Sequence, residues 1–493
     1  MLLSWLLACG TDVAVDSGPA VADGPSGFTL GDVVACDAGG PPTWTEDPTP
    51  PEVYTVTSER GHEPGAVAVV DVAGTPWLVW APPWSGVRAR PLAGGSSSQL
   101  DARMAHGITQ ADLDGDGAVE VLLTREDLTI VWGMGTADQR VLSLSVEEGE
   151  TVRDVAVADV DGDSHLDLVL AFSHPDHDDI EALRGEVRFG GNGRRFRRVV
   201  PIEGDDDVWG PAFDLTVFDR DADARPDVYL CNDFGATAAP NVVLANEGGM
   251  LVPAEDGAGL DIRTSCMGSA FGDVSADGRL DAFVVSTPVS FVLEGSPGGW
   301  YDASAARALP SIDLPHMGWG AVIEDLDNDG DGDVLMGASD FYSETMTPFP
   351  MFWYRQAADG TFTDAAAEAG FPQEAHTRAV VARDLNGDGV LDLVVSDALR
   401  SPWVFWSDGC SEGAWLAIDA PYGSQVVVRA GDRAWAAQVT SDSAWAASGP
   451  PRAHIGLGDL LEVDAVEITP PWGETVVLDG PIAARRVVTW APP

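Results

Sequence analysis

The chain contains no lysine, and all 27 of its basic residues are arginine. Chemistry that needs a lysine amine, such as Schiff-base formation or general-base catalysis by lysine, is therefore excluded. No apolar run reaches about 18 residues, so no internal membrane span is expected. The G-x-S-x-G nucleophile elbow and the H-E-x-x-H zinc-binding helix are also absent, which weakens the case for an enzyme.

Positive charge is scarce. The 79 acidic residues far outnumber the 27 arginines and give a formal net charge of −52. Such a surface repels polyanions, so neither nucleic acid nor an anionic membrane surface is expected as a partner. With 493 residues and 45% hydrophobic content, the chain is long enough to bury one large core and a small appended domain.

Acidic residues recur at positions one, five and nine of a nine-residue loop that occurs six times, and four of the six copies also have an acid at position three. Two carboxylates about 4 Å apart repel by about 4 kcal/mol at an effective dielectric near 20, unless a cation lies between them. We therefore predict up to six calcium ions as cofactors. The predicted ligands are Asp112, Asp114, Asp116 and Glu120; Asp159, Asp161, Asp163 and Asp167; Asp219, Asp221, Asp223 and Asp227; Asp273, Ser275, Asp277 and Asp281; Asp325, Asp327, Asp329 and Asp333; and Asp384, Asn386, Asp388 and Asp392.

Calcium fits because it accepts six to eight oxygen ligands in a flexible geometry. A helical EF-hand would need a glutamate at position twelve, where all six loops have an apolar residue. Short β-branched runs precede and follow each loop, which predicts a β-hairpin whose turn holds the ion. A solvated acidic turn is the alternative for any single copy. Ser164 and Ala224 stand at position six, where a glycine would favour a left-handed backbone conformation.

The loops start at residues 112, 159, 219, 273, 325 and 384, so the repeat is 47 to 60 residues long. Strand-rich repeats of this length are typical of propeller blades. Residues 66–80 have the same strand-turn-strand form without the ligand set and are counted as a metal-free first blade, which makes seven. The predicted propeller covers residues 51–408, and a small β domain covers residues 409–490.

The loops and the apolar strands after them resemble FG-GAP/VCBS repeats, the calcium-bearing blades of integrin-α-like propellers. The segment His454-Ile-Gly-Leu-Gly458, with the later Pro471-Trp-Gly473, is similar to the ASPIC/UnbV module of cartilage acidic proteins and their bacterial relatives. Ile455 stands where that module usually has Phe, a conservative departure. The resemblance implies an all-β fold, a seven-bladed integrin-α-like propeller with calcium loops, followed by a small C-terminal β domain. It implies a secreted or surface protein with no established catalytic residues.

Residues 1–9 end in Leu-Leu-Ala-Cys9, which looks like a bacterial lipoprotein cleavage box with Cys9 as the lipidated residue. Only eight residues precede Cys9 and none is basic, unlike the usual export signal. A plain cleaved signal and a chance match in a cytosolic protein are the alternatives. We expect an extracellular or outer-surface location in a bacterium, with membrane contact only through the lipid. Residues 10–50 are rich in Gly, Pro and Asp and are predicted to form a flexible tether.

Five cysteines leave four for pairing if Cys9 is acylated. Cys231 and Cys266 are expected on the propeller face opposite the calcium turns, where a disulfide is plausible. Cys36 and Cys410 flank the first and last blades, and a bridge between them would close the ring. Buried free thiols are the alternative for both pairs.

The segments that lead into the inner strands should line the channel on the face opposite the calcium turns. They carry aromatic, sulfur and imidazole groups suited to binding an extracellular protein or carbohydrate. The alternatives are a plain apolar core, a histidine metal centre, or a polysaccharide lyase or hydrolase. The candidate residues are His106, Trp209, Met267, His316, Trp319, His376 and Arg378.

Overall fold

The computed structural model describes residues 27–35, 42–49, 51–52, 65–82, 86–173, 183–191, 194–204, 208–235, 237–312, 316–340, 348–407, 413–443 and 445–492. These residues form 38 strands in nine sheets and contain no helix, so the prediction of an all-β fold is confirmed. Accordingly, no helix that could cross a membrane is found among them.

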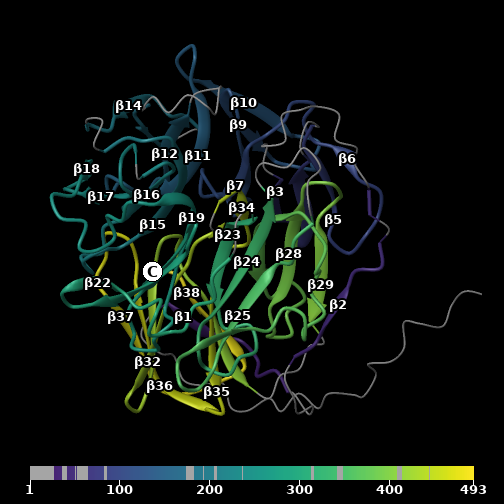
Figure 1. The fold of residues 1–493 in the computed structure, drawn as a ribbon, viewed down its shortest axis with the longest axis vertical. Helices are drawn as coiled ribbons and strands as arrows, with labels where there is room; N and C mark the ends of the chain where they lie inside the picture. Colours follow the sequence, from purple (N-terminus) through teal and green to yellow (C-terminus); the bar gives the residue numbers. More distant parts are fainter. Residues whose placement is uncertain are drawn as a thin grey trace, which may run out of the picture.

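Seven sheets are built from consecutive strands that follow the sequence repeat (Figure 1). They comprise β3 (Ala66–Val72), β4 (Thr75–Ala81), β5 (Arg88–Pro91) and β6 (Ser98–Gln99); β7 (Gly107–Ala111), β8 (Glu120–Thr124), β9 (Asp127–Trp132) and β10 (Arg140–Ser145); β11 (Thr151–Ala158), β12 (Asp167–Ser173), β13 (Glu186–Phe189) and β14 (Arg198–Pro201); β15 (Ala212–Phe218), β16 (Asp227–Asn232), β17 (Val242–Asn246) and β18 (Leu251–Pro253); β19 (Ser265–Gly272), β20 (Asp281–Thr287), β21 (Phe291–Ser296) and β22 (Gly299–Asp302); β23 (His316–Glu324), β24 (Asp333–Asp340), β25 (Phe352–Gln356) and β26 (Phe362–Asp364); and β27 (Thr377–Arg383), β28 (Asp392–Asp397) and β29 (Trp403–Ser407).

The first strands of these sheets form a closed ring, in which β3, β7, β11, β15, β19, β23 and β27 each contact the next and β27 contacts β3. Inner strands such as β11 and β27 are buried along their whole length, and both are rich in Val and Ala. The outer strand β10 instead is exposed at alternate residues. Continuous apolar runs suit strands covered on both faces, whereas alternation suits an edge. This arrangement is that of a propeller.

The first sheet lacks the acidic loop because β3 and β4 are joined by a tight turn at Ala73 and Gly74. Both residues have positive φ, 53° and 79°, as a two-residue hairpin turn requires. Asp71 caps the turn by accepting the backbone N–H of Gly74 at 2.6 Å. The first blade therefore has no room for an ion loop.

The N-terminal segment adds two short strands, β1 (Phe28–Leu30) and β2 (Trp44–Glu46). The outer edge of the last blade is completed by β2, which pairs with β29, while β1 pairs with β38 (Arg486–Trp490). The Trp44 indole donates to the Leu391 carbonyl at 2.9 Å. The prediction of a flexible tether over residues 10–50 is thus wrong for these strands, because backbone pairing and a packed tryptophan hold them.

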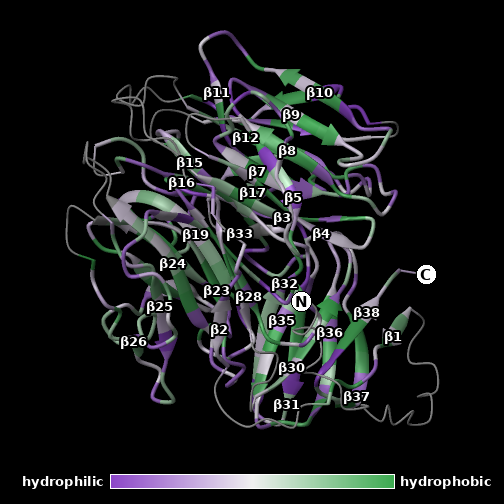
Figure 2. Ribbon diagram, turned by 90° about the vertical axis from the view of Figure 1, so that its right-hand side faces the viewer, coloured by the Kyte–Doolittle hydropathy of each residue, from purple (hydrophilic) through white to green (hydrophobic). Residues whose placement is uncertain are grey.

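The C-terminal domain consists of two further sheets with their own apolar core, seen at the lower right of Figure 2. One sheet has the order β1-β38-β30-β35 and the other β32-β31-β36-β37. The other strands of these two sheets are β30 (Ala414–Asp419), β31 (Gln425–Ala430), β32 (Arg433–Gln438), β35 (Ala453–Gly458), β36 (Glu462–Thr469) and β37 (Val476–Ala483).

A hairpin leaves this domain and enters the propeller ring. It consists of β33 (Asp442–Ser443) and β34 (Ala447–Ser448), and β34 pairs in parallel with the inner strand β3 (Figure 1). Trp445 at its tip is 2% exposed and stacks on Trp319 with ring centroids 5.0 Å apart. The hairpin therefore fills the centre of the ring with apolar side chains.

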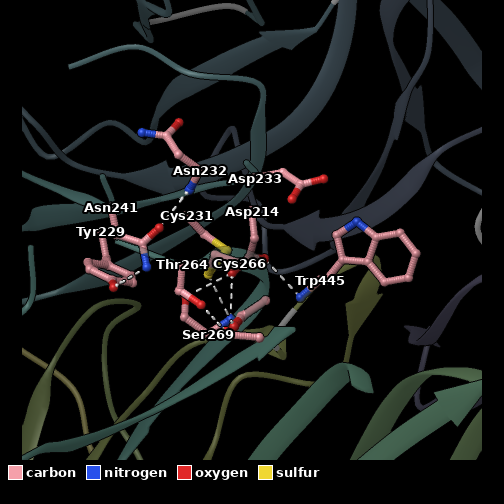
Figure 3. The surroundings of a disulfide bond; sticks show 12 residues. Asp214, Tyr229, Cys231, Asn232, Asp233, Asn241, Thr264, Cys266, Ser269 and Trp445 are labelled. Carbon is pink, nitrogen blue, oxygen red and sulfur yellow. Dashed lines mark hydrogen bonds between the residues drawn. A yellow bond between two sulfur atoms is a disulfide. The ribbon is translucent and has the colours of Figure 1, made fainter. Parts of the chain in front are cut away.

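Cys231 at the end of β16 is disulfide-bonded to Cys266 at the start of β19, with Cα atoms 5.5 Å apart (Figure 3). The bond joins two neighbouring blades. Cys9, Cys36 and Cys410 lie outside the described residues.

Candidate metal centres

All six acidic loops connect the first and second strands of a blade, from the β7–β8 loop to the β27–β28 loop. We number them loop 1 (112–120), loop 2 (159–167), loop 3 (219–227), loop 4 (273–281), loop 5 (325–333) and loop 6 (384–392). Because strands flank every loop, each is the turn of a β-hairpin, as the β-branched runs before and after the loops predict.

The carboxylate at position one closes each loop upon itself. In loop 5, Asp325 accepts the backbone N–H of Asp329 at 3.1 Å and that of Gly330 at 2.7 Å. Equivalent bonds to positions five and six occur in the other five loops. Because these N–H groups donate to a side chain of the same loop, the chain bends around the residue at position one.

This closure requires positive φ at position six. The glycines found there in four loops adopt it, with φ from 83° to 94°. Ser164 and Ala224 adopt it too, at 68° and 64°, although a side chain makes this conformation costly. Loops 2 and 3 therefore keep the common shape despite their substitutions.

The carboxylate at position nine is buried and ties the loop to its blade. In loop 6, Asp392 accepts the N–H of Leu385 at 2.9 Å and the N–H of Ser407, on the third strand, at 2.8 Å. Loops 2 to 5 repeat both bonds. Glu120 of loop 1 makes the first bond, to Leu113, at 2.9 Å.

Burial raises the pKa of these position-nine groups, because a charged carboxylate loses its hydration. The pKa of Glu120 rises to about 8, and that of Asp167, Asp281 and Asp392 to about 7. Neighbouring loop carboxylates add repulsion in each case. A cation inside the loop would offset both the lost hydration and the repulsion.

Loop 5 gives the sharpest fit to an ion. Asp325, Asp327 and Asp333 are all buried, and one oxygen from each lies within 4.8 Å of the others. Asp327 pairs with Arg355 through Oδ2 at 2.5 Å, but its buried Oδ1 has no hydrogen-bond partner among the described residues. Buried acceptors are normally satisfied, so this oxygen points to a missing partner of positive charge. The residues present therefore fit an oxygen-coordinated divalent ion.

Loops 1, 2 and 3 bring the same three positions together. Their clusters are Asp112, Asp114 and Glu120; Asp159, Asp161 and Asp167; and Asp219, Asp221 and Asp227. Loops 4 and 6 form no triad of acids among the described residues, because Ser275 and Asn386 replace the acid at position three. Both keep an oxygen there, and Asn386 Oδ1 accepts the Asp388 N–H at 2.9 Å.

The predicted ligand at position five lies outside these triads. In all six loops its Oδ1 accepts the backbone N–H of position seven, as Asp329 does from Asp331 at 3.0 Å. In loops 1, 3, 4 and 5 the second oxygen of this group pairs with an arginine, namely Arg194, Arg225, Arg279 and Arg355.

Sequence reasoning did not connect the loops with arginines from elsewhere in the chain. Arg194 pairs with Asp114 and with Asp116, the latter at 3.2 Å, and Arg198 pairs with Asp161 at 3.1 Å. These arginines follow the loops by tens of residues, so no local pattern relates them. They supply part of the counter-charge that the acids need.

The predicted ligand-binding rim is not an exposed surface in this structure. Met267, His376 and Arg378 are buried, and so are the indoles of Trp209 and Trp319. Trp319 lies between the Arg378 guanidinium, 3.8 Å from its ring centroid, and Trp445. The burial of Trp209, Met267 and Trp319 is what the core interpretation predicts. His106 is partly exposed, and the His316 side chain lies outside the described set.

Comparison with known families agrees with the loops and the C-terminal domain. The FG-GAP-like repeat family matches residues 112–170 and 325–395, and the ASPIC and UnbV family matches residues 419–490. The chain thus contains FG-GAP-like repeats and a C-terminal ASPIC/UnbV domain, which confirms the resemblance. No curated protein matches the chain.

Solved structures with a similar chain path include BBS1N in complex with ARL6DN, with 9% identity, a TM-score of 0.41, and coverage of 72% of this chain and 96% of that one. An ancestral GH74 enzyme has 12% identity and a TM-score of 0.42, with 88% of this chain and 63% of the enzyme covered. Sqt1 of Saccharomyces cerevisiae has 8% identity and a TM-score of 0.42, with 72% and 99% covered.

Proposed function

We propose that this protein is a calcium-stabilised propeller that acts as a binding scaffold for an extracellular protein or carbohydrate. The observation that carries the calcium assignment is the shared closure of six loops around carboxylates at positions one and nine. Every potential ligand is an oxygen, which suits calcium or magnesium rather than the transition metals. Calcium is the better fit, because loops with four or more protein oxygens leave little room for the waters that magnesium retains.

The ion would act structurally. It binds the folded loop better than the unfolded chain and adds RT ln(1 + [Ca]/Kd) to the stability. With a Kd of roughly 0.1 to 1 mM, typical of extracellular modules, millimolar calcium adds about one kcal/mol per site. Over several sites this is a large part of the stability of an ordinary domain.

The calcium assignment is tested by thermal unfolding of the purified chain in millimolar calcium and in EDTA, together with elemental analysis. We expect the melting temperature to rise by many degrees with calcium and the protein to retain the metal after gel filtration. An identical melting curve in EDTA, with no metal found, refutes the proposal.

The extracellular partner is supported by the resemblance of the repeats and by the strongly negative charge, which suits neither nucleic acid nor anionic lipid. The C-terminal domain covers much of the loop face, so the opposite face and the outer strands are the surfaces open to a partner. A glycan array and a pull-down in calcium test this part of the proposal. Cell fractionation of wild type and Cys9→Ala tests the lipid anchor, since only the wild type should enter the membrane fraction.

A further inference from the structure

Trp472 of the C-terminal domain is inserted between loops 2 and 3. Its indole Nε1 donates to the carbonyl of Asp159 at 2.8 Å, and its backbone N–H donates to the carbonyl of Ala224 at 2.6 Å. These carbonyls belong to position one of loop 2 and position six of loop 3. A Cβ on Gly162 would lie 2.8 Å from the indole, so loop 2 has a glycine where the ring rests.

The strand β32 docks on loops 4 and 5. The Ala436 N–H donates to Asp273 Oδ2, the position-one carboxylate of loop 4, at 2.9 Å. The Trp435 indole donates to the Gly330 carbonyl of loop 5 at 2.9 Å. Asp273, a candidate metal ligand, thus also accepts a hydrogen bond from the C-terminal domain.

The His454-Ile-Gly-Leu-Gly458 segment packs against loop 5. A Cβ on Gly456 would lie 1.8 Å from Asp325 Oδ2, and a Cβ on Gly458 would lie 2.7 Å from the Asp329 carbonyl. The Gly458 N–H donates to the Asn328 carbonyl at 3.1 Å. The glycines of this segment are therefore required for contact with the acidic loop.

Loop 6 also lies against the domain, because the Trp415 ring occupies the space that a Cβ on Gly389 would need. Loop 1 is the exception. Its hydrogen bonds within the described residues run to its own backbone and to Arg194, and none reaches the C-terminal domain. Five of the six acidic loops therefore form one docking surface, and the sixth is a natural control.

From these contacts we infer that calcium binding in loops 2 to 6 controls how firmly the C-terminal domain is seated on the propeller. This inference rests on the proposed calcium binding. The acceptors that receive the domain are loop carbonyls and one loop carboxylate, and their positions depend on the closed loop. Without an ion, repulsion among the acids opens the loops and displaces these acceptors.

The loosened state keeps the two domains together, because the hairpin with Trp445 remains inside the ring. The measurable change is therefore local opening of the docking surface rather than dissociation. It appears as faster amide hydrogen exchange in β32, in residues 454–458 and in residues 471–473.

The test is hydrogen exchange by mass spectrometry on the full chain, in millimolar calcium and in EGTA. Allosteric coupling between two sites typically corresponds to about 5- to 150-fold. We expect exchange in the three segments to quicken by a factor in that range when calcium is removed. Unchanged exchange in a protein shown by calorimetry to bind calcium overturns the inference and leaves the proposed function intact. Absence of calcium binding overturns both.

Matched variants locate the effect. Asp327→Ala and Asp114→Ala remove the same position-three ligand from loop 5 and from loop 1. In calcium, the first should quicken exchange in β32 and in residues 454–458, whereas the second should leave these segments unchanged. An equal response of the segments to both variants would show that general loss of stability is the cause, and it would contradict the inference.

Reciprocity gives an independent test, because a domain that senses the ions must also strengthen their binding by the same factor. Trp472→Ala removes the indole between loops 2 and 3 and should weaken calcium binding at two sites in calorimetry. Leu461→Ala on the same domain is the control, because that side chain is 66% exposed. Equal calcium affinities in wild type and Trp472→Ala would refute the coupling.

Discussion

The backbone N–H of Trp445 donates to the Asp214 carboxylate at 2.8 Å inside the propeller ring (Figure 3). The other oxygen of Asp214 accepts the backbone N–H and the hydroxyl of Ser269, at 2.9 and 2.8 Å. A fully buried acid on β15 therefore joins a neighbouring blade to a hairpin of the C-terminal domain. The two domains share one core at this point.

Trp445→Ala should destabilise the whole chain. The side chain is 2% exposed, stacks on Trp319, and lies 5.4 Å from Phe213 by ring centroids. Truncating a buried tryptophan typically costs about 3 to 5 kcal/mol, because both burial and packing are lost. Urea unfolding in EDTA measures the loss without a contribution from calcium. Leu461→Ala should change the stability by less than about 0.5 kcal/mol, and an equally small change in Trp445→Ala would show that the hairpin is peripheral.

The acidic loops could be predicted from sequence because their ligands are local. All four ligand positions fall within nine residues, and the six copies recur at a spacing that defines blades. The closing bond from position nine to position two lies inside the same window. The bond from Asp392 to Ser407 does not, since it depends on how the third strand returns to the loop.

The short strands could not be predicted, because two or three residues show no periodicity. Ala447–Ser448 pairs with β3 across more than 370 residues of chain, and Trp44–Glu46 pairs with β29 over a similar distance. The same dependence on contacts distant in sequence explains why the predicted ligand-binding rim is buried in the structure. Trp319 and Arg378 do lie where inner strands begin, but a hairpin from another domain covers Trp319, so the aromatic and basic groups form core.

His454 should make the stability depend on acid. Burial lowers its pKa to about 3, with Arg383 and Arg452 adding repulsion, while its ordinary value is 6.5. The neutral ring makes a 2.8 Å hydrogen bond with Asn328 and stacks on Trp415. Between pH 6.5 and 3 the unfolded chain takes up a proton that the folded protein does not. The stabilisation from neutral His454 is thus complete above pH 6.5 and falls by about 1.4 kcal/mol per pH unit below it.

The check is urea unfolding of wild type and His454→Gln in EDTA between pH 4.5 and 8. Glutamine can still donate to Asn328 but cannot titrate. We expect the two stability curves to converge as the pH falls, because only the wild type has a side chain at position 454 that is protonated in the unfolded chain and neutral in the folded protein. Parallel curves would show that the imidazole titrates normally in the folded protein.

Position six of the loops permits a reciprocal pair of substitutions. Ala224 has a φ of 64°, where an L-residue other than glycine is strained by about 1 to 2 kcal/mol. Ala224→Gly relieves this strain at a smaller entropic cost, so it should raise the stability by up to about 1 kcal/mol. Gly117 has a φ of 85° at the same position in loop 1, and a Cβ there would meet no described residue within 4 Å. Gly117→Ala should therefore lower the stability by a similar amount through strain alone. Thermal unfolding in EDTA measures the stability change of each variant without a contribution from calcium. Changes of the same sign in both variants would contradict a common loop geometry.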